Sequence, residues 1–188
     1  SNALARYETI TADLPISSLD VKKLKSETWM NEVDLFVKSL AFYILSFLLI
    51  GVSWMVKPTL FRNISYLSLI VGFLIHGYGI LLRMQIMGRP PVSTLYESVI
   101  FVSFIILLLA VTLEYFRADG LGIFVGSVGG SILHFVGFSY AADGDTLGML
   151  VAVLDSNFWL ATHVTTITIG YGASLAAGFI GHLYSVSY

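Results

Sequence analysis

Five long apolar segments constrain the fold of this chain more than any other feature of its sequence. They cover residues 35–56, 64–82, 95–116, 121–140 and 158–186 and are separated by polar stretches. About 20 apolar residues are enough to cross roughly 30 Å of hydrocarbon as an α-helix. The sequence therefore predicts an all-α, polytopic helical membrane protein with about five transmembrane helices.

The composition agrees with this class and excludes others. Charged residues make up 12% of the chain and the mean hydropathy is +0.84, whereas soluble domains are about 25% charged. A net charge of −2 lacks the basic footprint that nucleic-acid binding needs. The chain has no cysteine, so any ligand for a soft metal or a cofactor has to come from histidine, methionine or tyrosine.

The chain divides into two parts by composition. Residues 1–34 are polar and of mixed charge, and Ser1–Ala3 resembles the remnant of a removed tag. The rest of this part is either an external linker or an interfacial segment, with a short amphipathic helix over residues 21–33 as one alternative. Residues 35–188 are expected to form one five-helix transmembrane domain.

The basic residues of the loops predict how the helices cross the membrane. Loops on one side carry three basic residues and loops on the other side carry two, namely Lys57, Arg62 and Arg117 against Arg83 and Arg89. Because basic loops stay in the cytoplasm, the first set is expected inside. The acidic loop around Asp143 and Asp145, and His163 after it, are then expected on the outer, periplasmic side of the inner membrane.

A glycine pattern marks the fourth segment. Gly122, Gly126, Gly130 and His134 recur every four residues and therefore lie along one face of a helix. Glycines at this spacing let the backbone of another helix approach closely, which is how helices associate in lipid. We interpret the pattern as a packing seam.

Four histidines are the main candidates for chemistry, because a histidine in a span is costly unless it has a partner or lines a cavity. His76, His134 and His182 are each compatible with a structural role. His163 opens the fifth segment, with Trp159 one turn before it and Thr166 and Gly170 on the same face. An imidazole beside an aromatic ring and a smooth face suits a flat cofactor such as haem, but a structural histidine at an interface fits equally well.

Other chemistries have little support in the sequence. It contains no phosphate-binding loop, no metalloprotease motif and no serine nucleophile elbow. The carboxylates of the spans, Glu97 and Glu114, lie at span ends, which disfavours a transporter with a buried acidic proton relay.

Two blocks of sequence carry a family resemblance that covers about residues 30–188. The first is Gly-Arg-Pro-Pro-Val-Ser-Thr-Leu-Tyr-Glu-Ser at 88–98, and the second is Leu-Asp-Ser-Asn-Phe-Trp-Leu-Ala-Thr-His-Val at 154–164. In this order they resemble the cytochrome c assembly family, and within it the CcsA-type C-terminal part of the CcsBA cytochrome c synthases of system II.

The resemblance implies a haem-transporting membrane protein that delivers haem b to the outer face and attaches it to the Cys-x-x-Cys-His motif of apocytochrome c. A ResB/CcsB-like partner or fused domain belongs to that machinery. His163 matches the first of two external family histidines that bind haem, so it is expected to be an axial ligand of the haem iron. His76 is a second candidate haem-binding residue, and Trp159 is expected beside the haem.

The sequence also departs from the family pattern. It lacks the Trp-rich segment and the second external histidine, and Thr94 stands where the family usually has asparagine. We therefore expect a fragment of the synthase that is inactive in ligation on its own. The alternative is a non-catalytic membrane bundle or transporter subunit with structural histidines.

Overall fold

The computed structural model describes residues 34–56, 58–88, 90–92, 94–142 and 157–186. The expected amphipathic segment at 21–33 and almost all of the acidic loop lie outside these residues. The described residues form five α-helices and no strand. These are α3 (Leu35–Met55), α4 (Pro58–Met87), α5 (Leu95–Arg117), α6 (Leu121–Ala142) and α7 (Asn157–Val186).

Each helix is long and apolar enough to cross a membrane, so the prediction of an all-α, multi-pass membrane protein is confirmed. The largest difference concerns α4, which begins at Pro58 and not near residue 64, and ends at Met87. Its 30 residues extend over about 45 Å, which exceeds the hydrocarbon thickness. Hydropathy missed both ends because Arg62 and Arg83 interrupt the apolar run while the backbone stays helical.

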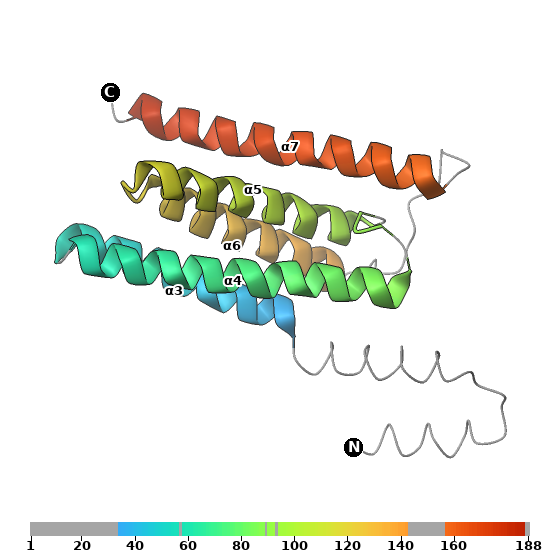
Figure 1. Ribbon diagram of the computed structural model, residues 1–188, viewed down its shortest axis with the longest axis horizontal. Coiled ribbons are helices and arrows are strands. Elements are labelled where there is room, and N and C mark those ends of the chain that lie inside the picture. The colour runs from blue at the N-terminus through green and yellow to red at the C-terminus, as the bar shows by residue number, and fades with distance from the viewer. Residues whose placement is uncertain (1–33, 57, 89, 93, 143–156, 187–188) are drawn as a thin grey trace, which may run out of the picture. The chain divides into compact units, whose positions relative to one another are not determined.

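The helices pack as two antiparallel hairpins (Figure 1). α3 packs along α4, α5 packs along α6, and the two hairpins meet mainly through α3 and α6. α7 packs chiefly on α5 and only weakly on α6. Much of the α7 surface is consequently open.

The glycine seam of α6 is occupied by α5 and by α3. A Cβ atom on Gly122 would lie 2.5 Å from the carbonyl oxygen of Ala110, so the backbones of α5 and α6 touch there. A Cβ on Gly130 would lie 3.2 Å from side-chain atoms of both Leu107 and Tyr43. The Tyr43 ring also abuts Gly72 of α4, where a Cβ would lie 2.7 Å away. Tyr43 of α3 therefore fits between α4 and α6 because both helices have glycine at its level.

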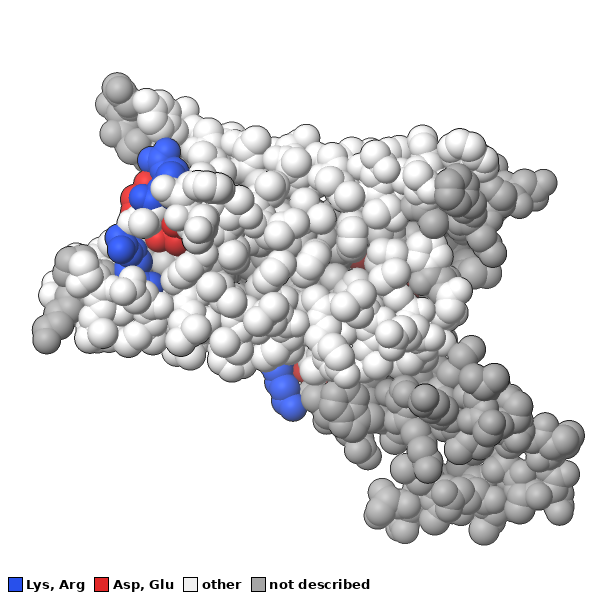
Figure 2. Space-filling model, in the orientation of Figure 1, with Lys and Arg blue, Asp and Glu red and all other residues white. Residues whose placement is uncertain are grey.

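Charged side chains gather at one end of the visible face (Figure 2). Both carboxylate oxygens of Glu114 accept hydrogen bonds from the Gly120 amide, at 3.1 and 3.0 Å. The Arg62 guanidinium donates to the carbonyl of Ala118 and so ties α4 to the α5–α6 turn. In that turn, burial raises the pKa of the Asp119 carboxyl, but hydrogen bonds from the Leu121 amide and from Arg117 outweigh it and hold the pKa below its usual value.

Candidate functional site on the open face of α7

The position of His163 is set by the way α7 sits on α5. Gly172 lies close to α5, since a Cβ there would lie 2.8 Å from Ile105 and 3.4 Å from the Val102 carbonyl oxygen. Val164 packs against the apolar cluster that contains Tyr96, at the start of α5. The N-terminal ends of α5 and α7 therefore lie at the same end of the bundle.

His163 lies on the opposite side of α7 from this seat. It is nine residues before Gly172, which is about two and a half helical turns, and its side chain is exposed. Neither ring nitrogen has a hydrogen-bond partner among the described residues. The imidazole is thus open to a ligand.

The residues expected to share a face with His163 are also exposed. Trp159 is 62% exposed, and a Cβ added at Gly170 would meet nothing within 4 Å. The Thr166 hydroxyl donates to the Thr162 carbonyl of its own helix at 2.7 Å, which leaves its methyl group for the surface. The result is a nearly smooth apolar strip with one imidazole and one indole at its N-terminal end.

His76, the second candidate, lies elsewhere. It is fully buried among the first four helices, and its Nδ1 is 3.1 Å from the Tyr43 hydroxyl. Its ring makes edge contacts with Phe36 and Phe104, at centroid distances of 5.7 and 5.6 Å. The structure therefore does not bring His76 together with His163.

The neighbour of His76 is His134, a pairing that sequence reasoning missed. The two ring centroids are 4.7 Å apart and the rings are nearly perpendicular, at 80°. His134 is also fully buried. The signal in the sequence was only that each histidine shares a face with glycines of its own helix, and no spacing within one helix reveals which residue of another helix lies opposite.

Hydrogen bonds fix the protonation of His134. Its Nδ1 lies 2.8 Å from the Gly130 carbonyl oxygen, and because a carbonyl only accepts, Nδ1 carries the proton. Nε2 faces the Ser39 hydroxyl at 3.2 Å, and that hydroxyl donates to the Phe36 carbonyl oxygen at 2.9 Å. His76 Nε2 has no hydrogen-bond partner among the described residues.

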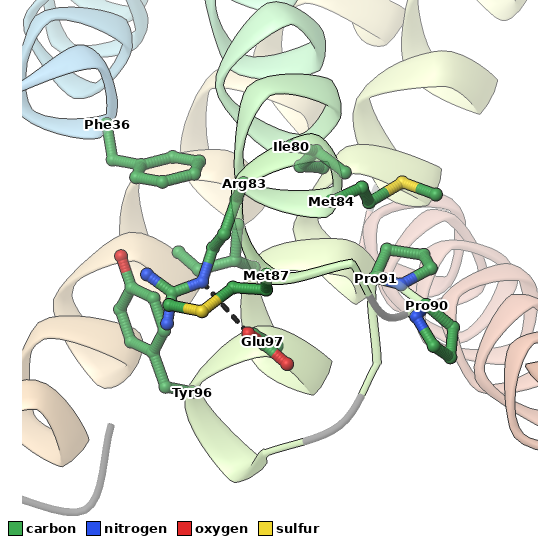
Figure 3. A pocket seen from close by; sticks show the side chains of 10 residues that line it. Phe36, Ile80, Arg83, Met84, Met87, Pro90, Pro91, Tyr96 and Glu97 are labelled. Atoms are coloured by element: carbon green, nitrogen blue, oxygen red, sulfur yellow. Dashed lines mark hydrogen bonds and ion pairs between the residues drawn. The ribbon is translucent and has the colours of Figure 1, made fainter. Parts of the chain in front are cut away.

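A buried ion pair closes the bundle at the end where α4 joins α5. Arg83 Nε donates to Glu97 Oε1 at 2.9 Å, with the side chains 15% and 4% exposed. The guanidinium carbon also lies 5.0 Å from the centre of the Tyr96 ring. Figure 3 shows these groups around a small pocket whose walls include Phe36, Met87 and Pro90. Sequence analysis placed both charges at span ends but did not predict that they pair.

This set of residues fits one haem axial ligand and no closed metal centre. Among the described residues, no group of three or more histidine or carboxylate side chains could hold a metal ion. Haem needs only one or two axial side chains and an apolar face for its ring. The exposed His163 and the smooth strip beside it are the described residues that fit these two requirements.

No family model matches the chain, but individual relatives do. It is 34% identical over 108 residues to the cytochrome c biogenesis protein CcsA of Chlorella vulgaris, covering 57% of this chain and 34% of that protein. For CcsA of Guillardia theta the identity is 32% over 100 residues, with 53% and 33% covered. The chain is therefore similar in sequence to part of these CcsA proteins.

A third relative matches over a longer range. Protein NrfI of Wolinella succinogenes is 29% identical over 166 residues, which is 85% of this chain and 18% of NrfI. The chain thus spans about a third of the CcsA relatives and less than a fifth of NrfI. These similarities bear out the resemblance to CcsA-type cytochrome c biogenesis proteins.

Proposed function

We propose that this chain acts in cytochrome c biogenesis as a haem-handling portion of a CcsA-type protein, with His163 as an axial ligand of haem b. The observation that carries the proposal is the open imidazole of His163 on an apolar strip of α7, in a homologue of CcsA. A buried or hydrogen-bonded imidazole would have favoured a structural role for this residue.

The residues of α7 have separable roles in this proposal. His163 would hold the haem iron, and the smooth strip to Gly170 together with Trp159 would offer apolar surface to the macrocycle. When bound, haem supplies the vinyl groups that react with the two thiols of an apocytochrome c Cys-x-x-Cys-His motif. The protein contributes position, because a group held in the right geometry reacts without the entropic cost of an encounter.

The remaining partners of the system II machinery are part of the same proposal. A second haem ligand would come from outside the described residues, and a ResB/CcsB-like protein or fused domain would complete the assembly. His163 faces the periplasmic side of the inner membrane. His76 remains a candidate ligand that would have to leave its contact with Tyr43 to reach iron.

A substitution with rescue tests the role of His163. His163→Gly should lower the amount of haem that copurifies with the chain, as measured by absorption spectra and a pyridine haemochrome assay. Added imidazole should restore it, because a free ligand can enter the space that the side chain leaves. His182→Gly is the matched control, since His182 is the other exposed histidine of α7. Equal haem in the His163→Gly variant and the unchanged protein would remove His163 from the site.

The second candidate function is that of a non-catalytic helix bundle. It is favoured by one observation, the enclosure of His76 and His134 within the packing of four helices. If the unchanged protein binds no haem in the same assay, the result favours a non-catalytic helix bundle.

A further inference from the structure

The His76–His134 pair lies where all four helices of the two hairpins converge. α3 reaches it with Tyr43, whose hydroxyl is 3.1 Å from His76 Nδ1, and with Ser39, 3.2 Å from His134 Nε2. These contacts fix α3 against α4 and α6. In lipid, hydrogen bonds of this kind hold helices together where the hydrophobic effect does not.

α5 touches the pair through two consecutive residues. The Ser103 hydroxyl is 3.4 Å from His134 Nδ1, where it accepts a share of the proton that Nδ1 donates to Gly130. The Phe104 ring packs edge-on against His76 and stacks on Phe73 of α4, with centroids 4.7 Å apart and planes within 10°. The pair and its surroundings therefore set where α5 lies against α4 and α6.

The same stretch of α5 carries α7. Val102 and Ile105 pack against Gly172 of α7, where a Cβ would lie 2.8 Å from Ile105. Four consecutive residues, 102–105, thus contact the histidine pair on one side and α7 on another. A displacement of α5 at this level moves the seat of α7 and, with it, His163.

We infer that the His76–His134 pair is a positioning element, in which His134 fixes α5 and thereby the placement of α7 and its His163 face. The positioning role does not itself depend on the proposed function. Only its predicted effect on haem binding rests on that function. This role makes His134 a positioning residue and not a ligand, because both ring nitrogens lie against groups of the core, Nδ1 at the Gly130 carbonyl and Nε2 at the Ser39 hydroxyl.

The lack of native cysteine allows a direct test by spin labelling. Labels at Leu45→Cys on α3 and Tyr171→Cys on α7, which are 45% and 63% exposed, report the α3–α7 distance by double electron–electron resonance. His134→Leu should shift this distance by about 1–2 Å, the scale of helix shifts in packed bundles, and broaden its distribution. His134→Gln, which keeps a donor and an acceptor, should restore much of the original distribution.

A second readout addresses the consequence for haem. His134→Leu should weaken haem binding at His163 by roughly tenfold, within the range of coupling between separate sites, and His134→Gln should recover part of it. His182→Leu is the control: its Nδ1 contacts the Gly178 carbonyl oxygen at 2.9 Å, as His134 contacts Gly130, but on an exposed surface. That variant should change neither the distance nor the affinity.

The outcomes separate the two hypotheses. A folded His134→Leu protein with an unchanged α3–α7 distance overturns the positioning role, whatever haem does. If His134→Leu does not fold, Ser103→Ala is measured in its place. Ser127→Ala is then the control variant, because the Ser127 hydroxyl donates to the Phe124 carbonyl of its own helix. If His134→Leu shifts the distance while the unchanged protein itself binds no haem, the positioning role is supported and the proposed function is refuted.

Discussion

At the scale of single residues, the same amino acid has opposite consequences on α6 and on α7. Gly122 has the α5 backbone within 2.5 Å of where a Cβ would lie, whereas nothing lies within 4 Å at Gly170, Gly178 or Gly181. Glycine is therefore required by packing on α6. On α7 these three glycines instead leave a smooth surface that no other helix touches within 4 Å.

This contrast predicts the sign of two alanine substitutions. Gly122→Ala should lower the free energy of unfolding by about 1–3 kcal/mol, because overpacking forces backbones apart. Gly181→Ala should raise it slightly, by up to about 1 kcal/mol, since alanine is the better helix former. Thermal unfolding in detergent compares the two. Equal effects of the two substitutions would contradict the assignment of the seam to α6.

A second comparison at residue scale concerns the two ion pairs among the described residues. Arg83–Glu97 is almost fully buried, whereas Arg117–Asp119 has side chains 59% and 38% exposed. Removing one member of a buried pair leaves an uncompensated charge, while an exposed pair is screened by solvent.

Glu97→Gln should consequently destabilise the protein by roughly 3 kcal/mol. Asp119→Asn should cost less than about 1 kcal/mol through the ion pair. Because the folded pKa of Asp119 is lowered, the stabilisation by its carboxylate is fully present above the usual pKa of an aspartate and is lost as the pH falls through the folded pKa. Denaturant or thermal unfolding of both variants at neutral pH tests the difference. If Asp119→Asn lowers the free energy of unfolding as much as Glu97→Gln does, burial does not determine how much each ion pair contributes to stability.

At the scale of elements, sequence reasoning predicted what depends on one helix at a time. The number of helices follows from apolar run length, and the α6 seam follows from Gly122, Gly126 and Gly130 on one face. That His163, Trp159 and Gly170 share a face is likewise a property of α7 alone. These features needed only the helical period.

What the sequence did not reveal is how one helix lies against another. The pairing of His76 with His134 depends on the register between α4 and α6, and the pairing of Arg83 with Glu97 depends on the geometry of the turn between α4 and α5. Neither register nor turn geometry is contained in spacing along a single helix. The length of α4 was missed for another reason, because charge at a helix end lowers hydropathy without ending the helix.

At the scale of the whole molecule, the two ends of the bundle differ in chemistry. One end has the α5–α6 turn with Arg62, Glu114 and Arg117. The other end has the buried Arg83–Glu97 pair and the start of α7 with His163. If basic turns stay in the cytoplasm, the His163 end faces outward, as the proposed function requires.

Two labelling sites on α5 test this orientation. Leu95→Cys lies at the His163 end and Phe116→Cys at the opposite end, and both positions are exposed, at 44% and 78%. Neither substitution alters a charge, so the topology signal is kept. A membrane-impermeant maleimide should label Leu95→Cys in intact spheroplasts, and should label Phe116→Cys only after the membrane is opened. The reverse pattern would place His163 in the cytoplasm, and haem held there could not be delivered at the outer face.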